Sequence, residues 1–167
     1  TNTLFANNQA TNGSGAALQF ESSGQVDLIH LTVGAHSVAT GSAIEVLTGS
    51  IGITNTIVVS HAIGISNSGG LASQDYTLFF GNGQNTQGAV TSGANSVQGT
   101  PKFQDPGQGD YHLSSGSAAI DAGIDANVLV DFEGEIRPLD GGFDIGFDEI
   151  DHAATLPNKL YLPLVLR

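Results

Sequence analysis

The 167-residue sequence contains no cysteine, methionine or tryptophan, and aromatic residues make up only 7% of it. Without cysteine the chain forms no disulfide and offers no thiolate nucleophile, although this alone does not assign a reducing compartment. The apolar runs are also too short to cross a bilayer. These shortages exclude a disulfide-stapled scaffold and a membrane-spanning protein.

Basic residues are the next shortage, with four Lys and Arg against 16 Asp and Glu and a formal net charge of −12. None of the four precedes Lys102. Binding to nucleic acid or to anionic lipid requires clustered basic side chains, so we expect neither partner. The charge is compatible with bound cations or with a secreted protein kept soluble by self-repulsion.

Proline is absent before Pro101, whereas glycine is abundant at 23 residues. Proline interrupts strand pairing, so its absence fits strands that are paired on both sides. Short apolar phrases alternate with Gly- and Asn-rich segments, where corners need positive φ angles. This pattern favours many short strands over a helical bundle.

A short phrase occurs four times in the first half of the chain, ending at Asn8, His36, His61 and Asn82. The number of residues between the ends of successive phrases decreases along the chain. It stays at roughly 20 to 30 residues, which is the length of one repeat unit. Self-similarity at such a period indicates stacked units that bury a continuous core together. With three short strands per turn, the pattern predicts an all-β, single-stranded parallel β-helix (a solenoid) over residues 1–100.

The polar residues that end the four phrases allow two interpretations. Stacked side chains at a corner satisfy one another and nearby backbone groups, which gives Asn8, His36, His61 and Asn82 a structural role. Alternatively, His36 and His61 stack on adjacent turns and bind a metal ion. No carboxylate accompanies the two histidines, so we favour the polar ladder.

The composition changes at Pro101, because twelve of the 16 acidic residues lie between Asp105 and Asp151 and the repeats stop. Five phrases follow in order: Asp105-Pro106, Gly109-Asp110-Tyr111-His112-Leu113, Ser117-Ala118-Ala119-Ile120-Asp121-Ala122-Gly123, Arg137-Pro138 and Asp144-Ile145-Gly146-Phe147-Asp148-Glu149. They resemble the C-terminal region of secreted bacterial right-handed parallel β-helix proteins of the pectate-lyase-like superfamily. Two departures are Ala118, where these proteins usually have proline, and Phe147, where they usually have alanine.

The resemblance implies that the solenoid is right-handed and that residues 101–151 form an acidic C-terminal cap region. It also implies a fold that hosts pectate lyases and glycoside hydrolases. Such lyases commonly use Ca²⁺ held by carboxylates together with a basic residue, but residues 1–100 contain no Lys or Arg. The repeats therefore lack the Lys or Arg that this chemistry commonly uses.

The remaining candidates for catalysis in the repeats are few. Glycoside hydrolysis needs two nearby carboxylates, and Glu21 and Glu45 take different positions within their phrases, so we do not expect them to stack on one face. His30, His36 and His61 remain conceivable bases. We assign no catalytic residue.

The carboxylates of the acidic region allow two interpretations. On the first, they bind Ca²⁺, with ligands from Asp121, Asp131, Asp144, Asp148 and Glu149. On the structural interpretation, which we favour, Asp121 and Asp144 cap turns and pair with Arg137. Phe103 and Tyr111 either form a sugar-stacking platform or, as we favour, pack inside this region.

Residues 152–158 are typical of a linker, and residues 159–167 of an extended apolar strand. The first phrase begins almost at Thr1, so we expect a processed chain or a fragment whose first turn is uncapped. If the tail strand of one copy covers the first turn of the next copy, the contact joins two different surfaces. Such a heterologous contact allows further copies to be added in the same way. The residues assigned to this contact are Leu4, Phe5, Leu160, Tyr161, Leu162, Leu164, Val165 and Leu166.

The sequence thus favours a non-enzymatic extracellular or cell-surface structural protein that requires no cofactor. Its copies would assemble head to tail as a filament or surface layer, and a cell-envelope glycan is a further candidate partner. Two alternatives stay open. The chain is the C-terminal module of a larger secreted carbohydrate-binding or polysaccharide-degrading protein, or its tail is a sorting or anchoring signal.

Overall fold

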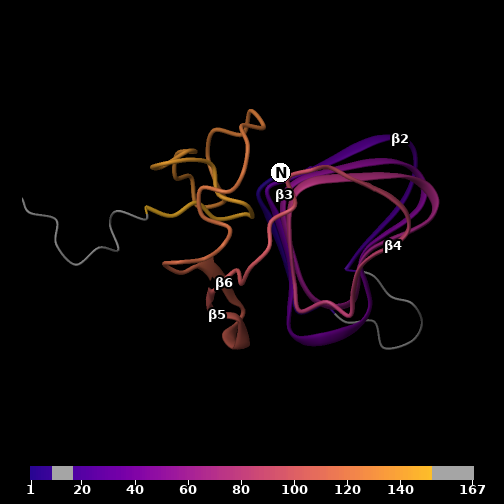
Figure 1. The fold of residues 1–167 in the computed structure, drawn as a ribbon, viewed down its shortest axis with the longest axis horizontal. Helices are drawn as coiled ribbons and strands as arrows, with labels where there is room; N and C mark the ends of the chain where they lie inside the picture. The colour runs from indigo at the N-terminus through magenta and orange to yellow at the C-terminus, as the bar shows by residue number, and fades with distance from the viewer. Residues whose placement is uncertain (9–16, 152–167) are drawn as a thin grey trace, which may run out of the picture.

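The computed structural model describes residues 1–8 and 17–151, with only the backbone described for residues 36–39. This part is all-β, and its main element is a strongly curled parallel sheet (Figure 1). The sheet consists of β1 (Thr3–Ala6), β2 (Leu18–Ile29), β3 (Leu31–Phe80) and β4 (Gln84–Ser92). A short antiparallel pair follows, formed by β5 (Phe103–Asp105) and β6 (Asp110–Leu113) around the 3-10 turn η1 (Pro106–Gln108).

The strand register follows the repeat. Thr3 of β1 lies opposite Leu31 of β3, and Ile63 of β3 lies opposite Gln84 of β4. The two pairs are separated in sequence by the first and the last step of the repeated phrase. β3 runs for 50 residues and bends repeatedly, so that successive windings of the chain overlie one another in Figure 1.

Aliphatic side chains fill the space that the curled sheet encloses. Two-residue alternation directs every second side chain of a strand inward, as with Ile51 and Ile53, which are each 1% exposed. The buried members of this inner core are Val33, Ala43, Ile44, Val46, Ile51, Ile53, Val58, Ile65, Ala72 and Phe79. Its contributors come from all along the sheet, so neighbouring windings stabilise one another.

One wall of the sheet is apolar on both faces. Val58 points into the inner core, whereas its neighbours Ile57 and Val59 belong to a second core on the outside. Consecutive apolar residues are typical of strands buried on both sides. By contrast, Gln19 is exposed between the inward residues Leu18 and Phe20.

The acidic region packs against this wall. The buried members of the second core are Ile57, Val59, Leu78, Tyr111, Leu113, Ala119, Ile145 and Phe147, which come partly from the sheet and partly from residues 111–147. Leu4 of the first winding and Val97 near the last also contact it, so the region covers the side of the stack (Figure 1). Residues 101–151, which the sequence suggested as a C-terminal cap region, therefore pack in the described residues against the outer face of the sheet.

Hydrogen bonds fix the acidic region to the sheet. Asn55 Nδ2 donates to the carbonyl of Ile124 at 2.7 Å, and Asn55 Oδ1 accepts from the Ile124 amide at 3.0 Å. The Tyr111 hydroxyl donates to Asn7 Oδ1 at 2.9 Å. No helix in the described residues has the length and apolar character needed to cross a membrane.

Candidate functional site

The acidic region contains a buried ion pair between Arg137 and Glu149. Arg137 Nη1 donates to Glu149 Oε2 at 2.6 Å, and both side chains are fully buried. The same guanidinium donates to the carbonyls of Asp144 and Gly146 at 3.3 and 3.0 Å. The partner of Arg137 is therefore Glu149, whereas the sequence had suggested Asp121 or Asp144.

The carboxylate of Asp131 organises a hairpin. Its Oδ1 accepts the amide N–H groups of Gly134 and Glu135, at 2.9 and 2.8 Å, and its Oδ2 accepts that of Glu149 at 3.1 Å. Three backbone N–H groups thus donate hydrogen bonds to the carboxylate of Asp131, a residue that is 4% exposed. Asp131 therefore acts as a structural turn residue.

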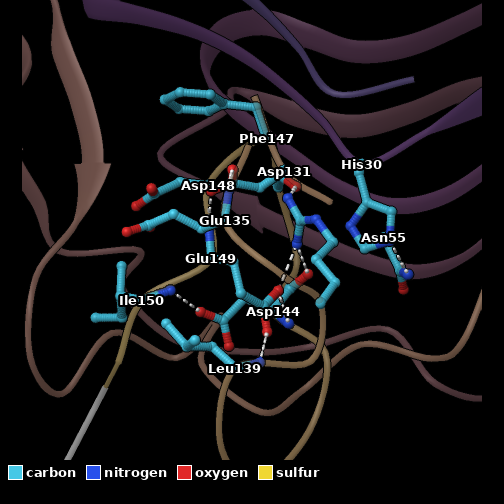
Figure 2. A network of polar contacts seen from close by, with 12 residues as sticks. His30, Asn55, Asp131, Glu135, Leu139, Asp144, Phe147, Asp148, Glu149 and Ile150 are labelled. Carbon is cyan, nitrogen blue, oxygen red and sulfur yellow. Dashed lines mark hydrogen bonds and ion pairs between the residues drawn. The ribbon is translucent and has the colours of Figure 1, made fainter. Parts of the chain in front are cut away.

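The carboxylate of Asp144 has a similar role. It accepts the amides of Asp121 and Ile150 at 2.8 and 3.0 Å, while burial raises its pKa to about 7 (Figure 2). Asp148 likewise accepts the Leu113 amide at 2.6 Å. The five carboxylates predicted to hold Ca²⁺ do not converge on one point in the described residues. Asp131, Asp144, Asp148 and Glu149 each accept hydrogen bonds from backbone amides instead.

A different cluster forms around His112. Its Nδ1 lies 2.6 Å from Asp110 Oδ1 and its Nε2 lies 3.0 Å from Glu133 Oε1. Ligand atoms of His112, Glu133 and Asp148 all lie within 4.8 Å of one another, the arrangement in the described residues that could hold an ion. Burial lowers the pKa of His112, but the hydrogen bonds to Glu133 and Asp110 outweigh it and raise the pKa to about 9. An imidazolium is a poor metal ligand, so the ring serves as a cation between carboxylates.

These side chains line a groove of about 350 Å³ at the surface of the acidic region. The lining residues are Gln104, His112, Leu113, Glu133, Glu135, Asp148, Ile150 and Asp151. Burial raises the pKa of Asp148, at its floor, to about 6. The groove is polar and acidic, with one positive charge held inside it.

The charge of His112 makes stability depend on pH. Because the folded pKa of about 9 exceeds the ordinary value of 6.5, this stabilisation is complete below pH 6.5 and is lost as the pH rises through 9. We expect the Tm of the wild type to fall across this window and that of His112→Gln to fall less. Thermal unfolding followed by circular dichroism measures both. If the Tm of the two proteins changed equally with pH, the result would contradict an imidazolium at this site.

Two of the four residues of the predicted polar ladder, His61 and Asn82, contact one another. Asn82 Oδ1 accepts the His61 amide at 3.0 Å, and Asn82 Nδ2 donates to the Val58 carbonyl at 2.9 Å. His61 Nδ1 bonds the Val59 carbonyl at 2.8 Å, and burial lowers the pKa of His61. Asn82 thus satisfies backbone groups of the neighbouring winding, whereas His61 bonds a carbonyl of its own strand.

The other two ladder members give less information. Asn8 is exposed, and the side chain of His36 lies outside the described residues. A metal shared by His36 and His61 therefore stays a prediction. His30 is fully buried beside Asn55 Nδ2, and burial together with the charge of Arg137 lowers its pKa to about 4. Neither His30 nor His61 is open to a substrate as a base.

Glu21 and Glu45 do not lie opposite one another in the sheet. Glu45 lies opposite Gln19, whereas Glu21 lies opposite Thr48, so the two glutamates occupy different positions across the ladder, as the sequence predicted. Tyr111 is 1% exposed, and the ring of Phe103 meets it edge-on at 5.0 Å between centroids. This aromatic pair packs the interior and presents no stacking platform.

The residues assigned to assembly lie partly outside the described chain. Leu4 packs against the second core and Phe5 against the inner core, both partly exposed. Within the described residues, β1 and β2 have no partner strand on the side that faces away from β3. The tail residues Leu160, Tyr161, Leu162, Leu164, Val165 and Leu166 fall outside the described residues.

Sequence reasoning missed two features of this region. The pairing of His112 with Glu133 joins residues that are distant in sequence and has no spacing signal. A hairpin at residues 129–137 exposes apolar side chains that a sequence pattern assigns to a core. The chain matches no family model, and no curated protein or solved structure matches it.

Proposed function

We propose that this chain is a non-enzymatic extracellular or cell-surface structural protein, built as a right-handed parallel β-helix whose copies assemble head to tail. The parallel register, in which strands pair at the steps of the repeated phrase, and the enclosed aliphatic core support the β-helix. Right-handedness and export rest on the resemblance of the sequence phrases. The buried, structurally bonded carboxylates and histidines support a protein without catalytic residues.

The observation that carries this proposal is the unpaired side of β1 and β2 in the described residues. Unpaired N–H and C=O groups accept a further strand, and β1 has none of the charges or prolines that commonly protect an edge. Residues 160–166 supply an apolar segment that suits this role. When the tail of one copy pairs with the edge of the next, the same contact can form again at each added copy. Such a contact does not close into a ring, so it produces a filament.

Removal of residues 160–167 tests the role of the tail. We expect the wild type to form elongated particles and the truncated chain to sediment as a monomer. Its Tm should equal that of the wild type at low concentration, because the described cores contain none of the deleted residues. Electron microscopy and analytical ultracentrifugation measure assembly. Undiminished particles from the truncated chain would show that the tail is not the connecting element.

The groove around His112 favours one alternative, a module of a secreted polysaccharide-degrading protein. Glu133 and Asp148 have oxygens within 4.8 Å, and the pKa of Asp148 is raised to about 6. Retaining glycosidases use two carboxyl groups at about this separation, one of them protonated. Release of reducing sugar by the wild type but not by Asp148→Asn would favour this alternative over the structural proposal.

A further inference from the structure

A hairpin of the acidic region concentrates exposed apolar side chains. Four of the seven large apolar side chains that stand exposed in the described residues fall between positions 129 and 136. They form what we name the hairpin face: Leu129, Val130, Phe132 and Ile136, which are 66%, 47%, 61% and 63% exposed. So dense a group on a soluble protein marks an interaction surface.

Contacts within the acidic region support the hairpin. Val130 and Ile136 are bridged antiparallel, and Asp131 fixes the turn through its bonds to backbone amides. The ring of Phe132 meets the buried ring of Phe147 edge-on, with centroids 5.9 Å apart. The hairpin face is therefore preorganised, which reduces the entropic cost of docking.

The hairpin face adjoins the first winding of the sheet. Asn2, next to β1, donates from its side chain to the Val130 carbonyl. The start of β1 and the hairpin therefore lie close together. A segment that adds to β1 as a strand comes within reach of the exposed apolar side chains.

Charge and composition identify the occupant. The segment Leu160–Leu166 is apolar, and it is flanked by Lys159 and Arg167, two of the four basic residues of the chain. The hairpin carries Glu133 and Glu135, which are exposed and line the acidic groove. Apolar contacts flanked by opposite charges fit this segment to the hairpin face.

We infer that the hairpin face is the docking site for residues 159–167 of a second copy of this chain. This inference rests on the proposed head-to-tail assembly and names its receiving surface. The apolar side chains of the tail cover Phe132 and Ile136, and its basic residues face Glu133 and Glu135. The tail thereby adds a strand to β1 and also covers the adjoining apolar surface.

Two complementary variants test this inference. The first, Phe132→Ser with Ile136→Ser, damages the hairpin face and keeps the tail. The second, Leu162→Glu with Leu164→Glu, damages the tail and keeps the face. We expect each alone to sediment as a monomer, whereas their mixture forms a heterodimer that grows no further, because one intact face meets one intact tail.

A matched control uses Leu71→Ser, which removes a side chain that is 73% exposed on β3 and lies outside the hairpin face. It should assemble like the wild type. Thermal unfolding verifies that each variant folds. If the face variant assembles like the wild type, or if the mixture stays monomeric, the inference is overturned while wild-type assembly stands. A monomeric wild type would overturn the proposed function and this inference with it.

Discussion

Replacing Arg137 by Met is expected to destabilise the fold by about 3–5 kcal/mol, the range for breaking one side of a buried ion pair. The substitution leaves the carboxylate of Glu149 buried without its guanidinium partner. It also removes the donors to the carbonyls of Asp144 and Gly146. Denaturation in urea, followed by circular dichroism, gives the change in the free energy of unfolding.

Two comparisons distinguish a lost ion pair from general damage. Adding Glu149→Gln to Arg137→Met should recover part of the stability, because no unpaired charge then stays buried. The recovery is only partial, because the amides of Leu139 and Asp144 donate to different oxygens of Glu149 and the single side-chain oxygen of glutamine replaces one of them. Lys102→Met removes an exposed cation and should change little. A loss from Arg137→Met no larger than about 1 kcal/mol, the range for exposed pairs, would contradict the buried pair.

Replacing Gly34 by Ala is expected to loosen the contact between the sheet and the acidic region. The new Cβ would lie 2.6 and 3.1 Å from two ring carbons of Tyr111 and 3.2 Å from a methyl group of Val59. Tyr111 is buried and cannot move without opening the second core, so we expect a cost of about 1–3 kcal/mol, as for overpacked interiors. Denaturation in urea measures this cost.

Gly24→Ala is the matched control for this substitution. The nearest atom to its added Cβ is 3.9 Å away, and its φ angle is not in the left-handed region. We expect a change within about 0.5 kcal/mol, as at ordinary surface positions. Equal effects at the two glycines would mean that Tyr111 does not pack on Gly34 in solution.

The repeat in the sequence indicates which strands pair, but it does not indicate where the acidic region packs. The repeat aligns Thr3 with Leu31 because equivalent residues of neighbouring windings pair directly. The adjacent apolar residues Ile57, Val58 and Val59 carried a further signal, since a strand with only one buried face alternates polar and apolar residues. That run was interpreted only as a repeat phrase, and so the apolar wall was missed.

The chemistry of the acidic residues was less accessible to prediction. Whether Asp131 or Asp144 binds a cation or a backbone amide depends on where N–H groups point after folding, which residue spacing does not show. For the same reason the sequence named Asp121 or Asp144 as the partner of Arg137, while the structure pairs it with Glu149. Buried carboxylates in turns resemble cation ligands in sequence, because both roles favour aspartate.

Head-to-tail assembly is tested most directly by sedimentation of the unmodified chain over a range of concentrations. If the contact between copies does not close into a ring, the size of the particles should increase with protein concentration. Electron micrographs of the same samples should then show filaments, or layers made of filaments. A single species of 17.0 kDa at every concentration would contradict assembly through the first winding and the tail.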